Sequence, residues 1–409
     1  MAMVHMKDLL THAYRNRYAV GAFEVVDLAF LDAILRAAED VRSPVILNIV
    51  DSHARWFDLE LLMAAVIRAA RRASVPVAVH LDHCRSPDRV EAGIRLGCNG
   101  IMFDTAGAAF PVNVEQTRQI VRLAHGCGIP VEGASGHVAG IAEEPPASPA
   151  TDSESVYTNV EEARVYVERT GVDFLAVSIG TVHGRSKTRM RLDFNRLIRI
   201  HEHVGVPLVV HGGTGLTDQQ YHKLIDHGVA KINYYTALAE VAGSTIRDNI
   251  QRGLTRYDQL FTGTTEALHA EVCRCMQVWR SAGRAAEVLM QCRPWHYVEH
   301  VIVFNAETTD PERVNDMLIK GKQNLARIPG VLTVQVGKAV TDKAKYPFCW
   351  LIRFAHEEVV ESYKHHPVHT DYADHHFRPL AADRITTDYE IIDTHALQNR
   401  FEPPLESNG

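Results

Sequence analysis

The chain has 409 residues, a formal net charge of −7 at pH 7, an apolar fraction of 46% and a charged fraction of 23%. This composition is typical of a globular protein, and the length predicts two domains because single hydrophobic cores stop growing near about 250–300 residues. The negative charge gives no reason to expect a nucleic-acid partner, and no apolar run approaches the roughly 18–20 residues that a membrane span requires.

The amino-terminal segment and the cysteines indicate the compartment. The first sixteen residues contain His5, Lys7, Asp8, His12 and Arg15 in place of a continuous apolar stretch, so they do not resemble a secretory signal. The seven cysteines are scattered without a Cys-x-x-Cys pair, which argues against a disulfide framework. We therefore expect reduced thiols and a cytoplasmic protein.

Between about Tyr18 and Tyr235, short β-prone segments alternate with longer segments of helical period. This alternation predicts repeated βα units around a parallel sheet. Eight units favour a closed (β/α)8 barrel, a TIM barrel, over an open doubly wound sheet, which remains the alternative. The expected strands are Ala19–Val25, Pro44–Val50, Val77–Leu81, Gly100–Phe103, Pro130–Glu132, Phe174–Ile179, Pro207–Val210 and Lys231–Tyr234.

A long polar segment, Ala134–Tyr157, interrupts the repeat after the fifth strand. Its proline, serine and acidic residues are unsuited to a buried element. We interpret it as a flap at the mouth of the barrel, with an insertion that has no catalytic role as the alternative.

A second domain is expected after the barrel. Thr264–Gln291 is predicted to form one long helix, and Arg293-Pro294 marks a junction, which divides the chain into residues 1–292 and 293–409. The second part has the pattern of a ferredoxin-like α+β domain. Its expected elements are strands Val298–Phe304, Val331–Gly337, Phe348–Phe354 and Ile385–Ile392, and helices Pro311–Ala326, Glu357–His365 and Asp371–Leu380.

Three of the predicted barrel strands lead into a histidine: His83, His183 and His211. Since the carboxyl ends of all barrel strands open on one face, these imidazoles can converge on a divalent metal with an open coordination position. Asp82 adjoins His83, and a carboxylate beside a cation stays ionised and can accept a proton from the substrate. The alternative for Asp82 is a carboxylate that only orients a metal ligand.

The loops after strands seven and eight are suited to a phosphate group. The segments His211–Gly215 and Asn233–Thr236 each lead into a helix, where free backbone N–H groups and closely approaching glycines, including Gly212, favour an anion. Barrels commonly bind phosphate at this position. The sequence therefore predicts a small phosphorylated substrate.

These residues, in this order, resemble the class II fructose-bisphosphate and tagatose-bisphosphate aldolases from Met6 to about Asp248. The resemblance is carried by His-x-Asp-His-Cys at His80–Cys84, Ile-Gly-Thr-x-His-Gly at Ile179–Gly184, His-Gly-Gly-Thr-Gly at His211–Gly215 and Gly-Val-Ala-Lys-Ile-Asn at Gly228–Asn233.

The resemblance implies a metal-dependent aldolase that cleaves a phosphorylated ketose to dihydroxyacetone phosphate and an aldehyde through a zinc-stabilised enediolate. It implies that His83, His183 and His211 hold Zn2+ or another divalent metal, that Asp82 is the acid/base residue, and that Na+ or K+ lies near Gly184. The residues implied around the substrate and its phosphate are Gly184, Gly212, Gly213, Thr214, Asn233 and Thr236.

The chain departs from the family pattern around the expected substrate. Glu24 stands where the family usually has asparagine, Val50 where many members have serine, and Ala134 where a second carboxylate is usual. In the flap, Ala142 takes the usual position of the acid and Glu143 follows it. We therefore hypothesise a substrate other than the common hexose bisphosphates, with Glu24 and Glu143 as further proton-transfer candidates.

Two other segments leave open what the substrate carries. Tyr234-Tyr235 replaces smaller or acidic residues beside the phosphate loop, and the basic segment 185–191 is either a site for a second phosphate or acid group or a solvated loop.

The carboxy-terminal part resembles the stress-responsive α/β-barrel (Dabb) family across about Val298–Asp393. His300–Phe304, Ile328–Val331, His366–His369 and Arg378–Leu380 carry the likeness. The resemblance implies a homodimer or higher homo-oligomer formed sheet against sheet. Two alternatives to the aldolase remain: a lyase or hydro-lyase in which this domain transforms an apolar or cyclic substrate, and a metal-binding scaffold without turnover.

Overall fold

The computed structural model describes residues 3–105, 107–135, 157–184, 192–308 and 310–391. Within these ranges no helix combines the length and the apolar character that crossing a bilayer would require. Most of the predicted flap, the basic segment 185–191 and Glu143 lie outside the described residues.

The amino-terminal part is a closed barrel of eight parallel strands in sequential order, which confirms the predicted TIM barrel. The barrel closes where β1 pairs with β8, with Val20 opposite Lys231. Nearly every strand residue is buried, as expected for strands that are covered by helices on the outside and packed against side chains inside. The strands are β1 (Val20–Glu24), β2 (Val45–Val50), β3 (Val77–Cys84), β4 (Gly100–Phe103), β5 (Val131–Ser135), β6 (Phe174–Val177), β7 (Leu208–Val210) and β8 (Val229–Tyr234).

The helices around the barrel begin at polar capping residues. Asp27 accepts a hydrogen bond from the Phe30 backbone at the start of α2, and Thr217 forms a capping box with Gln220 at α8. The helices are α1 (Met6–Arg15), α2 (Leu28–Asp40), α3 (Leu59–Arg72), α4 (Pro87–Arg95), α5 (Phe110–His125), α6 (Val160–Thr170), α7 (Phe194–His203), α8 (Asp218–Asp226), α9 (Thr236–Gln251), α10 (Tyr257–Leu260), α11 (Thr264–Val278) and α12 (Ala285–Gln291), and a 3-10 turn, η1 (Asp51–Arg55), follows β2.

The prediction of one helix over Thr264–Gln291 was wrong. The helix α11 ends at Val278, and the chain then turns through left-handed backbone at Arg280 and Gly283 (φ 63° and 81°) before α12 begins. The turn is fixed by Trp279, which is fully buried and stacks on Phe23 of β1. Burial of this indole outweighs the helical propensity of the segment.

The carboxy-terminal part is a four-stranded antiparallel sheet of order β10-β11-β9-β12 with helices on one face, the ferredoxin-like α+β arrangement that the sequence predicts. The predicted helix over residues 371–380 is instead the end of α15 and a π-helical turn. The elements are β9 (Val298–Phe304), α13 (Pro311–Leu325), β10 (Val331–Lys338), β11 (Phe348–Phe354), α14 (Glu358–His365), α15 (Pro367–Tyr372), the turn η3 (Ala373–Phe377) and β12 (Arg384–Glu390).

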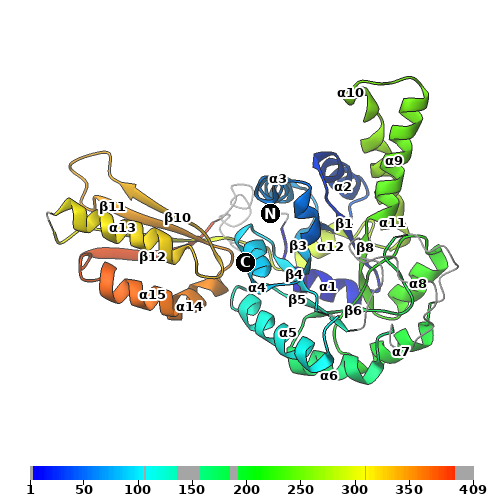
Figure 1. Cartoon of the computed structure of the whole chain (residues 1–409), viewed down its shortest axis with the longest axis horizontal. Coiled ribbons are helices and arrows are strands. Elements are labelled where there is room, and N and C mark those ends of the chain that lie inside the picture. The colour runs from blue at the N-terminus through cyan, green and yellow to red at the C-terminus, as the bar shows by residue number, and fades with distance from the viewer. Residues whose placement is uncertain (1–2, 106, 136–156, 185–191, 309, 392–409) are drawn as a thin grey trace, which may run out of the picture.

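The carboxy-terminal part lies to one side of the barrel, next to α4 and α5 (Figure 1). Trp295 in the connection stacks on His356 beside α14, and the Ser362 hydroxyl donates to the backbone oxygen of Gly126, in the turn between α5 and β5. Turns that lead from a helix into the next strand lie at the amino ends of the strands. The carboxy-terminal domain therefore packs against the side of the barrel, next to α4 and α5 and at the amino ends of the strands. The predicted boundary at residue 292, which stays a prediction, falls between α12 and β9.

Asp173 connects several elements at the amino ends of the strands. Its carboxylate accepts hydrogen bonds from His125 and the backbone of Val131, each at 2.8 Å, and pairs with Lys7 at 2.8 Å. Burial alone would raise the pKa of Asp173, but the hydrogen bonds from His125 and Lys7 outweigh it and lower the pKa. A group with a lowered folded pKa stabilises the protein above its unfolded pKa, and this contribution is lost as the pH falls through the folded pKa.

We predict that Asp173→Asn lowers the free energy of unfolding at pH 7 by about 1.5–3 kcal/mol, because hydrogen bonds to the charged group are lost. The difference from the unaltered protein should shrink as the pH falls below about 3.9, where the unfolded aspartate becomes protonated. Denaturant unfolding at several pH values measures this. The matched variant Asp258→Asn, at an exposed ion pair, should change stability by less than about 0.5 kcal/mol. A pH-independent effect of Asp173→Asn would contradict the role of the charge.

Candidate functional site

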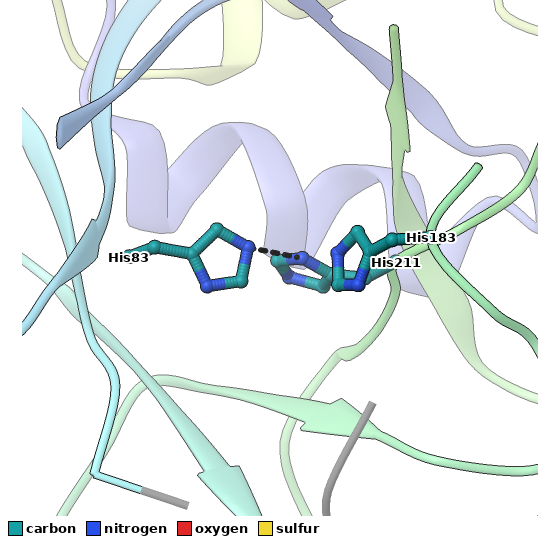
Figure 2. Close-up of side chains that lie close together, drawn as sticks. All are labelled: His83, His183 and His211. Atoms are coloured by element: carbon teal, nitrogen blue, oxygen red, sulfur yellow. Dashed lines mark hydrogen bonds between the residues drawn. The ribbon is translucent and has the colours of Figure 1, made fainter. Parts of the chain in front are cut away.

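The structure brings the three predicted histidines together at the carboxyl ends of the barrel strands (Figure 2). His83 lies at the end of β3, His183 follows β6 and His211 follows β7. Their ring centroids are 4.8–5.8 Å apart, and one nitrogen from each ring lies within 4.8 Å of the others. Three imidazoles in this arrangement can hold one metal ion.

A local irregularity lets two consecutive residues face the same site. Side chains of a regular strand alternate between its two faces, so Asp82 and His83 would point apart. The pairing between β3 and β4 shifts register between Leu81 and Cys84, and His83 has φ 54°, in the left-handed region. The shift turns His83 back toward the barrel axis, and its Nε2 lies 3.9 Å from Asp82 Oδ2.

Carboxylates fix the orientation of two of the rings. Asp104, directly after β4, lies 2.7 Å from His83 Nδ1, and Glu132 of β5 lies 2.8 Å from His211 Nε2. Each carboxylate accepts the ring N–H, so the other nitrogen of each ring is the one that can bind a metal ion. These two nitrogens, His83 Nε2 and His211 Nδ1, face each other at 3.2 Å.

The negative surroundings favour a cation at this place. Burial alone would lower the pKa of His83, but the Asp82 and Asp104 carboxylates outweigh it and raise the pKa to about 9. The same attraction acts on a metal ion that replaces the proton.

Glu132 is also the centre of a buried charge cluster. Its second oxygen accepts from the Lys231 ammonium group of β8 at 2.7 Å, and His80 Nε2 lies 3.7 Å from that oxygen. All three side chains are fully buried. Burial alone would raise the pKa of Glu132, but the positive charge of Lys231 and the hydrogen bond from His211 lower it, so the carboxylate stays ionised.

Asp82 is held below the cavity by two amides. Its Oδ2 accepts from Asn48 Nδ2 at 2.9 Å and from Asn233 Nδ2 at 2.6 Å. Burial alone would raise the pKa of Asp82, but His83 and Lys231 outweigh it and hold the pKa well below its usual range. The carboxylate is therefore ionised and lies directly beside His83.

A cavity of about 210 Å3 opens above the histidines. The three histidines line it, and so do Glu24 and all six residues predicted to surround the substrate and its phosphate: Gly184, Gly212, Gly213, Thr214, Asn233 and Thr236. Asp82 is not among the lining residues in this conformation.

Glu24 and His53 form a further acid–imidazole pair in the wall of the cavity. Glu24 Oε2 lies 3.7 Å from His53 Nδ1. Burial, with a contribution from Asp82, raises the pKa of Glu24 to about 8, and burial lowers the pKa of His53 to about 4.

Sequence reasoning did not assign roles to several of these residues. Asp104 directly follows the end of β4. The histidines were predicted from their positions at strand ends, and the same criterion would have identified Asp104 as a site residue. Glu132 and Lys231 were also visible as charged residues within apolar strand segments, but their pairing across the barrel requires the closed fold. The residues without an assigned role were Asn48, His53, Trp56, Asp104, Glu132 and Lys231.

Comparison with known families assigns the barrel. Residues 4–284 match the model described as fructose-bisphosphate aldolase class-II. The chain belongs to this family. It is therefore an aldehyde-lyase homologue, and the family implies a divalent metal and a small phosphorylated sugar substrate. Residues 298–391 match the Stress Responsive A/B Barrel Domain (Dabb), which confirms the second resemblance.

Individual relatives match between about three fifths and seven tenths of this chain. A fructose-bisphosphate aldolase of Geobacillus stearothermophilus is 34% identical over 292 residues, which are 70% of this chain and 100% of the relative. A sulfofructosephosphate aldolase of Alkalicoccus urumqiensis is 36% identical over 238 residues, 58% of this chain and 82% of the relative. The crystal structure of the YdjI aldolase from Escherichia coli K12 superposes with a TM-score of 0.62 at 29% identity, covering 69% of this chain and 99% of that one.

The residues present in this aldolase homologue fit the metal that the family implies. Three imidazoles present nitrogen to one point, two of them with the opposite nitrogen bound to a carboxylate. This donor set is the one that Zn2+ and similar divalent ions prefer in catalytic sites.

We predict that Asp104→Asn weakens metal binding by about 10–100-fold, because an amide no longer fixes the His83 ring in the metal-binding tautomer. Titration of the metal-free protein against a chromophoric chelator measures the affinity. The matched variant Asp51→Asn removes a similarly half-buried carboxylate, one that pairs with Arg89 instead of a histidine, and should leave the affinity within about threefold. Equal affinities for the unaltered protein and Asp104→Asn would contradict the role of Asp104 in orienting the His83 ring for the metal.

Proposed function

We propose that the barrel is a metal-dependent aldolase that reversibly cleaves a phosphorylated ketose, or a related aldol, to dihydroxyacetone phosphate and an aldehyde. The convergence of His83, His183 and His211 beside the ionised Asp82, at the base of a cavity with a glycine-rich wall, carries the proposal. Membership of the aldolase family supports it independently.

His83, His183 and His211 would hold the metal, for which we propose Zn2+. When bound, this ion supplies a Lewis acid that polarises the ketone and stabilises the negative charge left when the carbon–carbon bond breaks. The buried cluster of Glu132 and Lys231 keeps the His211 ring in place during the reaction. Na+ or K+ near Gly184 stays a prediction from the family resemblance.

Asp82 is the proposed base. In the cleavage direction it takes the proton from the hydroxyl on the carbon that becomes the aldehyde, and in the condensation direction it returns that proton. Asn48 and Asn233 hold the carboxylate between turnovers, because they donate both of its short side-chain hydrogen bonds. For Glu24 and Glu143 a proton-transfer role remains proposed, and Glu24 lines the cavity as that role requires.

The glycine-rich wall would bind the phosphate of dihydroxyacetone phosphate. Gly212 and Gly184 adopt left-handed backbone (φ 66° and 83°), and Thr214 and Thr236 add hydroxyl groups beside the start of α9. Backbone N–H groups at a helix start attract an anion without a lysine or arginine.

The test is exchange of a carbon-bound proton of dihydroxyacetone phosphate with solvent deuterium, followed by NMR. We expect exchange that chelation abolishes and Zn2+ restores, because the half-reaction requires the metal and the dihydroxyacetone phosphate site but no aldehyde.

We predict that Asp82→Asn lowers the rate of ketose cleavage by about 10²–10⁴-fold while the bound metal is retained, because the general base is lost. Release of dihydroxyacetone phosphate, coupled to a reporter reaction, gives the rate, and metal analysis of the same sample gives the occupancy. The exposed variant Asp88→Asn, in the first turn of α4, is the matched control. Cleavage at an unchanged rate in Asp82→Asn would remove this residue from the mechanism.

We also propose that the chain forms a homo-oligomer through the Dabb sheet. The face of the sheet away from its helices carries apolar side chains that are partly exposed, among them Leu351 (37%), Ile385 (51%) and Tyr389 (54%). Leu351 lies opposite Val301, and Val301 opposite Thr387, so these side chains form a continuous surface across three strands. Such a face is suited to a second sheet of the same kind.

We predict that Leu351→Glu shifts the protein from dimer to monomer at micromolar concentration, because a charge is placed in the centre of this apolar face. Light scattering after size exclusion measures the mass. Ile319→Glu is the control, since Ile319 is similarly exposed (58%) but lies on α13, on the other side of the sheet. A mass unaffected by Leu351→Glu would exclude this face as the interface.

A further inference from the structure

The active-site cavity has two walls of different chemistry. The strand ends of β6, β7 and β8 supply the glycine-rich wall described above. The strand ends of β1 and β2, together with Tyr235 after β8, supply a second wall that consists of Glu24, Val50, Ser52, His53, Trp56 and Tyr235. We refer to this set as the aromatic wall.

The aromatic wall is built around stacked rings. His53 and Trp56 stack with their centroids 4.3 Å apart and their planes at 22°, and Tyr235 lies 5.3 Å from His53 at 57°. Trp56 is 53% exposed although it is a large apolar ring. The Arg55 guanidinium lies 5.1 Å from the centroid of this ring, which adds a cation–π contact to the stack. An exposed indole at the mouth of a cavity is a surface on which a flat or apolar group can pack.

Two polar groups at the base of the wall retain hydrogen-bonding capacity. His53 is 7% exposed, and its Nδ1 is buried without a hydrogen-bond partner among the described residues. Glu24 lies 3.7 Å from this nitrogen, beyond hydrogen-bond distance. A buried polar atom without a partner is costly, so a ligand group that joins the pair is favoured.

The charge of the wall argues against a second phosphate. Within the described part of the chain no lysine or arginine lines the cavity, and Arg55, which contacts the Trp56 ring, is not a lining residue. A phosphate carries about −1.5 to −2 charges near neutral pH and is stabilised by arginine, lysine or free N–H groups. The glycine-rich wall offers backbone N–H groups for one phosphate. The described residues of the aromatic wall offer no comparable donors for a second phosphate.

We propose that the aldehyde half of the substrate is uncharged and carries an apolar or aromatic group, which packs on Trp56 and Tyr235, and a hydroxyl group, which binds Glu24 and His53. The proposal rests on the proposed function, since it assigns one half of the aldol to each wall. It also gives a role to the Glu24 and Val50 departures from the family: an apolar valine and a hydrogen-bonding carboxyl line the same side of the cavity.

The experiment compares two aldehydes of matched length in condensation with dihydroxyacetone phosphate: D-glyceraldehyde 3-phosphate, and 2-hydroxy-3-phenylpropanal, in which a phenyl ring takes the place of the phosphate. We expect the kcat/KM ratio to favour the phenyl aldehyde by at least tenfold. We also expect 3-phenylpropanal, which lacks the hydroxyl, to react at least fivefold less efficiently than its hydroxylated analogue.

Two variants test the wall itself. Trp56→Ala should lower the phenyl-to-phosphate ratio of kcat/KM by about tenfold, mainly through the KM for the phenyl aldehyde. Glu24→Asn should instead remove the preference for 2-hydroxy-3-phenylpropanal over 3-phenylpropanal, because both phosphate and phenyl aldehydes carry the hydroxyl that Glu24 binds. Each ratio is measured within one preparation, so it does not depend on the fraction of folded protein. The matched controls Tyr257→Ala, an 80% exposed aromatic residue on α10, and Glu60→Gln, at the exposed start of α3, should leave both ratios unchanged.

The possible failures are distinguishable because proton exchange of dihydroxyacetone phosphate is measured on the same preparation without aldehyde. Two results would overturn this inference while leaving the proposed function intact. Both include metal-dependent exchange: the first adds a preference for glyceraldehyde 3-phosphate, and the second adds kcat/KM ratios that are unchanged in Trp56→Ala and Glu24→Asn. No metal-dependent exchange would overturn the proposed function and this inference with it.

Discussion

The barrel depends on one buried interaction, the contact of the Glu132 carboxylate with Lys231 and His211. Taking an ammonium and a carboxylate out of water costs several kcal/mol for each ion, which their attraction offsets only with good geometry and further hydrogen bonds. Here both oxygens are used, one by Lys231 and the other by His211. The interaction connects β5 to β8 and to the end of β7 through the interior, so the strands and the metal-binding ring are positioned by the same carboxylate.

Unusual backbone conformations also position the metal-binding histidines. His83 takes a left-handed conformation that costs a non-glycine residue about 1–3 kcal/mol and is found mostly where surrounding structure enforces it. Gly212 is needed for a different reason: a Cβ at this position would collide with the backbone oxygen of Val182. The loops that carry His183 and His211 can approach each other because residue 212 has no side chain. The two deviations from regular backbone thus lie beside the three histidines.

Much of the fold was predictable because strand and helix periods differ. Segments such as Pro44–Val50 and Phe174–Ile179 are mostly apolar, and a closed barrel brings the carboxyl ends of all its strands to one rim, independently of the loops. The histidines at those ends could therefore be grouped from the sequence. The break after α11 could not be predicted in this way, because it depends on where Trp279 finds a pocket against Phe23.

The less predictable part of the site consists of cross-barrel and loop contacts. Lys231 contacts Glu132 although 99 residues separate them, and neither side chain carries a local signature of the pair. His53 lies in the 3-10 turn after β2 and Trp56 directly follows it, in a short polar and aromatic segment that has no periodic pattern. The contact of His53 with Tyr235 exists only because β1, β2 and β8 are neighbours in the closed sheet.

The position of the Dabb domain constrains how the two domains can cooperate. Its contacts with the barrel involve turns that precede strands: Gly126 accepts from Ser362, and the Tyr297 ring lies 3.6 Å below the Arg71 guanidinium at the end of α3. The histidines lie at the opposite ends of the strands. An intermediate released from the cavity would have to leave the barrel mouth and travel through solvent to reach the Dabb domain of the same chain. The arrangement therefore favours a Dabb domain that assembles chains over one that receives a product directly from the barrel beside it.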